Sequence, residues 1–144
     1  MAKAGQGSKS SVFYDYSLKI PANTTKAVPL EQEIYLPPGV IHRIEIGFPA
    51  GARHMVYIAM RHGLNQLWPT NADGSFNADN YTIVINEHYV IKTEPFILTL
   101  QGWSPGTTYD HTIEVRFGIL PAEVLMPEET FITAFKKLLT RLRL

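Results

Sequence analysis

Apolar and polar residues alternate along most of this 144-residue chain, and this period of two limits its fold more than any other feature. Successive side chains of an extended strand point to opposite faces, so alternation predicts strands with one buried face. In 12–20, for example, Leu18 and Ile20 share a face with two tyrosines. The predicted strands lie in 12–20, 30–36, 40–48, 54–60, 81–86, 95–102 and 111–120. In 54–60 both parities are apolar, which indicates a central strand.

Turn-forming residues separate these runs, as in "PANTT", "LPPG", "FPAGA", "NADGS" and "SPGTT". Seven or eight short strands at such spacing are typical of a β-sandwich or barrel. We therefore expect an all-β protein with a single antiparallel β-sandwich, jelly-roll-like, over residues 12–121. The connection 61–81 is long, and we expect a structured surface loop there.

The two ends of the chain differ from the middle. Residues 1–11 are small, polar and basic, and predict an extended arm. Residues 122–144 predict a linker and an amphipathic helix over 128–143. Pro127 suits the start of that helix, acidic residues lie near its beginning and basic residues near its end. Its apolar stripe consists of Phe131, Phe135, Leu138 and Leu142, widened by Ile132 and Leu139.

A helix this short is marginal alone in water, so the stripe has to be buried. Three destinations are open: its own sandwich, another subunit or partner, or a membrane surface. The two tryptophans leave similar alternatives, because Trp68 and Trp103 both flank turns. Each indole fits the edge of the core, a protein interface or a sugar-stacking platform. We select Phe131, Phe135, Leu138, Leu142 and Trp68 as candidate partner-binding residues.

Composition excludes several functions. The formal net charge is zero, with 13 basic and 13 acidic residues, which argues against direct nucleic-acid binding and against a membrane-surface protein. The chain has no cysteine, which removes disulfides, thiolate zinc sites and cysteine nucleophiles. No apolar run reaches the roughly 18 residues of a membrane span, and the first residues do not form a signal peptide. The expectation is a protein that stays where it is made.

The sequence matches catalytic and metal-binding motifs only in part. "GWSPG" at 102–106 matches the nucleophile-elbow pattern, but Pro105 has no N–H for an oxyanion hole and a strand follows. A hairpin turn is the simpler interpretation. "NADGSFNADN" at 71–80 lacks the glycine and glutamate that a calcium loop requires at its sixth and twelfth positions. We expect no enzyme activity, no catalytic residues and no cofactor.

The five histidines do not form a metal motif, because no HxH or HExxH pair occurs among them. His42, His54 and His111 share parity with apolar neighbours, so we expect them to point inward. Hydrogen-bonded histidines at the sandwich rim are the simpler interpretation. We predict no metal site.

Three segments resemble an uncharacterised group of structural proteins from tailed-bacteriophage virions: "IHRIEIGFPAG", "RHGLNQLWPTN" and "TYDHTIEVRFGILP". The order of a polar arm, a compact sandwich, the "FGILP" exit and a helical tail is also similar. The resemblance implies a non-enzymatic protein of the virion, assembled in the host cytoplasm. It also implies contacts with the major capsid protein or other virion proteins and several copies of the chain.

A capsid decoration or stabilising protein is the first functional expectation, bound to the shell through its terminal extensions and loops. A head–tail connector or tail component is the first alternative. The second is a carbohydrate- or receptor-binding β-sandwich module that uses the loop 62–80.

Overall fold

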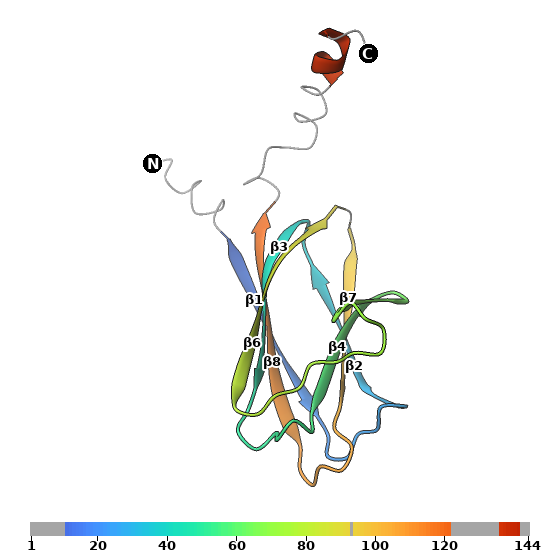
Figure 1. The fold of residues 1–144 in the computed structure, drawn as a ribbon, viewed down its shortest axis with the longest axis vertical. Helices are drawn as coiled ribbons and strands as arrows, with labels where there is room; N and C mark the ends of the chain where they lie inside the picture. The colour runs from blue at the N-terminus through green and yellow to red at the C-terminus, as the bar shows by residue number, and fades with distance from the viewer. Residues whose placement is uncertain (1–10, 93, 122–135, 142–144) are drawn as a thin grey trace.

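The computed structural model describes residues 11–92, 94–121 and 136–141. The eight strands are β1 (Val12–Ile20), β2 (Leu30–Leu36), β3 (Gly39–Phe48), β4 (Tyr57–His62), β5 (Asn65–Trp68), β6 (Tyr81–Ile91), β7 (Phe96–Trp103) and β8 (His111–Pro121). A short helix covers 136–141. Figure 1 shows two layers of strands facing each other, with this helix beyond one end of them. The expected all-β sandwich is therefore confirmed.

The strand order identifies the sandwich as a jelly roll. One sheet has the order β1-β8-β3-β6 and the other β2-β7-β4-β5. The first strand therefore pairs with the last, the second with the seventh, the third with the sixth and the fourth with the fifth, all antiparallel. Such nested pairs arise when one long hairpin is rolled up into two sheets. This arrangement defines a jelly roll.

Nested antiparallel pairing gives the sandwich two unlike ends. Short connections such as 37–38 and 63–64 lie at the end where β1 begins and β8 finishes. We call this the terminal end, because residues 1–10 and 122–144 both attach to the sandwich there (Figure 1). The opposite end, the loop end, carries four longer connections: 21–29, 49–56, 69–80 and 104–110.

The core lies between the two sheets and follows the predicted alternation. Ile113, Val115 and Phe117 of β8 are fully buried, and Leu98 and Leu100 face them from the other layer. Burying each such side chain contributes roughly 1.5–3 kcal/mol relative to leaving it exposed. The central position predicted from 54–60 is also confirmed, because β4 lies between β7 and β5.

Two local predictions were wrong, and one predicted strand was too short. The connection 61–81 is not one loop, because it contains β5, a four-residue strand paired with β4. The strand predicted over 81–86 continues to Ile91 and forms β6. The turn around "SPGTT" is not a hairpin turn, because β7 and β8 belong to different sheets and 104–110 crosses between them.

Phe117 provides a test of this core, since its ring is fully buried at the centre of β8. We expect Phe117→Ala to lower the free energy of unfolding by about 3–5 kcal/mol, because the substitution leaves a cavity in a close-packed layer. Urea denaturation monitored by tryptophan fluorescence measures the loss. Val28→Ala is the control: Val28 is 75% exposed, so its change should stay within about 0.5 kcal/mol. Equal losses for both variants would contradict the core assignment.

Candidate functional site

An aromatic and histidine cluster covers the outer surface of β8 at the terminal end. A β-carbon at Gly118 would lie 2.6 Å from Phe13 and 2.9 Å from His42, so both rings rest on a position where only glycine fits. The rings of Phe13 and His42 meet edge to face at 5.8 Å. Ser11 Oγ lies 2.7 Å from His42 Nε2, which fixes the histidine against the start of β1.

His42 was predicted to point inward, and this was wrong. The register between β3 and its neighbours shifts between Ile41 and Arg43, which marks a bulge at His42. A bulge adds one residue and re-aims the side chains around it. Ile41 is therefore fully buried, while His42 lies with Phe13 on the outer surface.

At the same end, on the opposite face of β1 and β8 from this cluster, is a mainly apolar groove, the terminal groove, with a volume of about 440 Å³ and with Glu94 in its lining. It lies where the chain enters β1 and leaves β8, next to the β2–β3 connection. Phe13, 55% exposed, and Val12, 37% exposed, place large apolar side chains at the same end. Such clustering of exposed apolar surface marks an interaction site more often than isolated residues do. The groove is lined mainly by Val12, Tyr14, Pro37, Pro38, Ile119 and Pro121.

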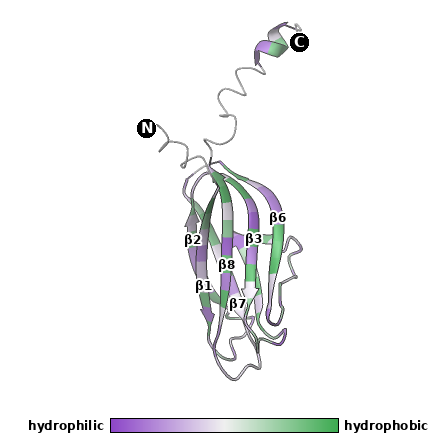
Figure 2. Cartoon of the chain, turned by 90° about the vertical axis from the view of Figure 1, so that its left-hand side faces the viewer, coloured by the Kyte–Doolittle hydropathy of each residue, from purple (hydrophilic) through white to green (hydrophobic). Residues whose placement is uncertain are grey.

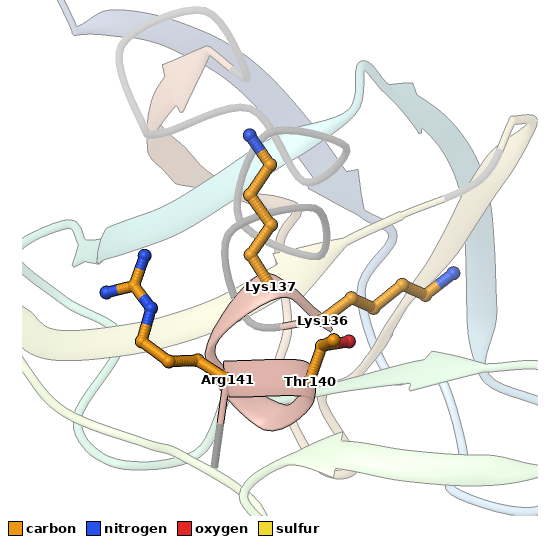
Figure 3. Close-up of a pocket in the computed structure, with 4 residues that line it drawn as sticks. All are labelled: Lys136, Lys137, Thr140 and Arg141. Carbon is orange, nitrogen blue, oxygen red and sulfur yellow. The ribbon is translucent and has the colours of Figure 1, made fainter. Parts of the chain in front are cut away.

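The helix 136–141 carries positive charge on a short length of backbone. Figure 3 shows Lys136, Lys137 and Arg141 pointing in different directions around a shallow hollow that Thr140 completes. Diverging cations do not converge on one small ligand, so the hollow is not a binding pocket of the usual kind. Leu138, predicted to belong to the apolar stripe, is 47% exposed. The other stripe residues, Phe131, Phe135 and Leu142, lie outside the described residues.

Of the two candidate anchors within the described residues, Trp68 is the buried one, at 5% exposed. Its Nε1–H donates to Glu87 Oε2 at 2.6 Å, and its ring meets Tyr89 edge to face at 5.4 Å. A hydrogen bond to a charged group contributes about 1.5–3 kcal/mol. The indole therefore joins β5 to β6 and has little surface left for a partner. Trp103 is also buried, stacked on Tyr57 at 5.9 Å.

The segment around Ser104 connects two loops through hydrogen bonds. Ser104 is fully buried, its N–H donates to Thr24 O at 2.8 Å and its Oγ donates to Pro21 O at 3.0 Å. Thr107 Oγ1 accepts from the N–H of Asn23. The hydroxyl of Ser104 in "GWSPG" therefore holds 21–29 against 104–110. This structural role accounts for a serine at this position.

At the other side of the loop end, Asp79 organises the β3–β4 connection. Its Oδ1 accepts the N–H groups of Gly51 and Arg53, each at 2.9 Å. These backbone hydrogen bonds, that of Arg53 foremost, hold the pKa of Asp79 below its usual value. His54, predicted to point inward, is exposed instead, and its Nδ1 lies 2.9 Å from Asn77 Oδ1. The polar residues of 71–80 therefore serve loop geometry in this structure.

His111 is the inward-pointing histidine that the structure confirms, at 4% exposed. Neither ring nitrogen has a hydrogen-bond partner, and the ring packs on Tyr109 at 4.5 Å between centroids. Both residues line a half-open cleft of about 370 Å³ at the loop end, together with Arg53 and Met55. The His111 nitrogens lie beneath the surface of this cleft, so they do not present a nucleophile or a ligand to it.

Charged side chains form a row across the outer surface of the β1-β8-β3-β6 sheet. Asp15 pairs with Arg116 at 3.4 Å, Arg116 with Glu45 at 3.4 Å, and Glu45 with Arg43 at 2.7 Å. Figure 2 shows hydrophilic colour on β8 and β3 in this region. The hydrogen bond from Arg43, foremost, lowers the pKa of Glu45, and Arg116 adds to this. We call this set the ion-pair row.

No group of three or more potential metal ligands occurs within 11–92, 94–121 and 136–141. In those same ranges, no helix is long and apolar enough to cross a membrane. The surface features on the described side chains are a mainly apolar groove, exposed aromatic rings and paired charges. The sequence pointed to the terminal helix, but the Phe13–His42–Gly118 cluster was missed, because it depends on three strands that are distant along the chain.

No protein-family model matches the chain, and no curated protein matches its sequence. Among solved structures, its fold is similar to a chain of the cyanophage Pam1 capsid asymmetric unit, with a TM-score of 0.50 and 13% identity over 78% of this chain and 86% of that one. It is more distantly similar to FLHE, with a TM-score of 0.45 and 7% identity over 76% and 97%. A tailspike protein, gp49 of Acinetobacter baumannii bacteriophage Fri1, has a TM-score of 0.31 and 14% identity over 82% and 19%. At these identities the likeness concerns the fold alone.

The ion-pair row predicts how stability depends on pH. A carboxylate whose pKa is lowered by folding stabilises the protein above its unfolded pKa, near 4.5 for glutamate, and this stabilisation is lost as the pH falls through the folded pKa. We expect Glu45→Gln to reduce the free energy of unfolding at neutral pH by less than about 1 kcal/mol, because the row is partly exposed. The deficit should vanish below the folded pKa.

Urea denaturation at a series of pH values measures this effect. Glu33→Gln is the matched control, since Glu33 is an exposed strand carboxylate without an ion pair in the described chain. The loss of unfolding free energy caused by Glu33→Gln should be near zero at every pH. A pH-independent deficit in Glu45→Gln would show that the ion-pair row is not what stabilises the protein there.

Proposed function

We propose that this chain is a non-enzymatic structural protein of a phage particle, in which the jelly roll is a rigid body and the terminal end is the attachment surface. The observation that carries the proposal is the position of the two terminal segments. Residues 1–10 and 122–144 attach side by side, because β1 and β8 are paired along their whole length with Val12 opposite Ile119. Two extensions that share one end can engage one partner surface together.

The terminal end has the chemistry that such attachment requires. The terminal groove and the exposed ring of Phe13 supply apolar surface, which is the main source of association energy. The helix 136–141 adds three cationic side chains. Two linked contacts on one surface raise the apparent affinity through effective concentration, and many copies on a lattice multiply the effect. The loop end then faces away from the particle.

The fold similarity to the capsid chain of cyanophage Pam1 supports a virion role, because both chains use the same sandwich architecture. Within a particle, we favour a capsid decoration or stabilising protein bound to the major capsid protein, present as a homo-oligomer. A connector or tail component fits the same fold. A sugar-binding role is less well supported, since Trp68, its candidate stacking residue, is buried.

Copy number separates these roles. Quantitative peptide mass spectrometry on purified particles, scaled to the major capsid protein, should find this chain at a ratio close to that of a lattice component. A ratio near that of a single ring would instead assign it to the connector or tail. Absence from the particles would remove the virion role altogether.

Truncation tests the attachment surface. We expect removal of 127–144 to abolish binding to particles in a sedimentation assay, because it deletes the apolar stripe of Phe131, Phe135, Leu138 and Leu142. The sandwich should remain folded, since β8 ends at Pro121. Circular dichroism and thermal unfolding of the truncated chain verify this.

The control for that experiment is a point substitution at the loop end. Tyr109 is 55% exposed there, far from the terminal groove, so Tyr109→Ala should bind particles as the full chain does. Binding that survives the truncation, or that is lost with Tyr109→Ala alone, would contradict attachment through the terminal end.

A further inference from the structure

We infer that two copies of this chain associate through β6, pairing antiparallel across a two-fold axis so that their four-stranded sheets join into one of eight strands. This inference concerns the chain in solution and does not depend on the proposed virion role. It rests on the state of one sheet edge, the β6 edge, which comprises residues 81–91.

The β6 edge is open. β6 pairs with β3 on one side, and within the described parts of the chain no backbone hydrogen bond joins its other side to a second strand. The sole backbone contact recorded there is local, from the N–H of His88 to Glu87 Oε1. An open row of N–H and C=O groups is a template for another strand. Eleven residues would supply about ten hydrogen bonds, as many as a typical interface contains.

The other three edges are protected in ways that β6 is not. β1 carries Asp15 and Lys19, both in ion pairs. β2 carries two exposed glutamates, Glu31 and Glu33, which would oppose like charges in a self-paired strand. β5 has only four residues. β6 is eleven residues long and contains no lysine, arginine or proline, the residues that usually guard an edge.

The exposed surface of β6 carries both apolar and polar side chains, because Thr82, Asn86 and His88 are exposed as well as the valines. Tyr81 is 64% exposed and Val84 and Val90 are each 45% exposed. The ion-pair row does not extend to β6: Val84 lies opposite Glu45 and Asn86 opposite Arg43. Figure 2 shows both apolar and hydrophilic colour along β6 at the sheet edge.

The inner face of β6 is also incompletely covered. Ile83 and Ile85 point toward the core but remain partly exposed, whereas Ile113 and Val115 of β8 are fully buried. The cause is the unequal length of the edge strands: the opposing sheet ends in β5, which is less than half as long as β6. A neighbouring strand along the β6 edge would bury these side chains further.

A second copy can pair along the whole of this edge because Asn86 is the middle residue of β6. In a continuous sheet, residues opposite each other must share a face, so the two-fold axis passes through a residue. Asn86 at the axis lets all eleven residues pair. Ile83 then lies opposite Tyr89 of the second copy, and Glu87 lies opposite Ile85, not opposite another Glu87. The zero net charge adds no long-range repulsion between copies.

Sedimentation velocity over a range of concentrations tests the association. We expect the full chain to form dimers and the double variant Val84→Lys/Val90→Lys to raise the dimer dissociation constant by at least about tenfold, because lysine at a strand edge opposes pairing. Both valines are exposed, so the fold should persist, as thermal unfolding will verify. Tyr35→Lys is the matched control: it places lysine on the exposed surface of β2 and should leave the dimer unchanged.

Cross-linking provides a readout that does not depend on affinity. The chain has no cysteine, so Asn86→Cys introduces a single thiol at the proposed axis. Mild oxidation should convert this variant into a covalent dimer, since directly opposed residues of an antiparallel pair have the Cα separation that a disulfide needs. Glu33→Cys on β2 should not form a covalent dimer under the same oxidation. A full chain that is monomeric at every concentration, or a dimer that Asn86→Cys fails to cross-link, overturns the inference.

Discussion

The pairing of β1 with β8 is the constraint on which the rest of this structure depends. It joins residues about a hundred positions apart, Val12 to Ile119 at one end and Ile20 to His111 at the other. Once this pair is set, each following strand pairs inside the previous one, and the rolled hairpin has its free segments at one end and its long loops at the other. Segregation of the terminal segments from the long loops thus follows from topology, without any dedicated sequence motif.

The unequal lengths of β5 and β6 are a second constraint on the structure. A four-residue strand cannot cover an eleven-residue one, so 69–80 and the indole of Trp68 fill part of the difference. Gln66 Nε2 ties this loop down by reaching Pro69 O, Asn71 O and Gly74 O at 2.9–3.1 Å. The hydrogen bond from Trp68 to Glu87 therefore gives this side chain a structural role in the fold. What remains uncovered is the far edge of β6, where Val84 and Val90 are each 45% exposed.

Alternation was sufficient to predict the fold class, the core positions of β8 and the central place of β4, because one-sided burial leaves a local signature in sequence. It failed where structure depends on distant residues. β5 has too few residues to show a period, and the bulge at His42 reverses the parity on which its burial was predicted. The role of Trp68 was open in sequence because its partner, Glu87, lies 19 residues away in another sheet. Of the predicted stripe, Leu138 and Leu139 lie in the described helix, where Leu138 is exposed and Leu139 is partly exposed.

The proposed contacts of this molecule share one sheet, and this limits how they can act together. The Phe13–His42 cluster and the ion-pair row both run across β1, β8 and β3, with the cluster nearer the terminal end, and β3 pairs directly with β6. Paired charges are costly to desolvate, so a partner that extends from the terminal end along the outer surface of this sheet would have to bury the row. The proposed attachment is therefore favoured at the end of the sandwich, whereas the proposed pairing would use the backbone edge of β6.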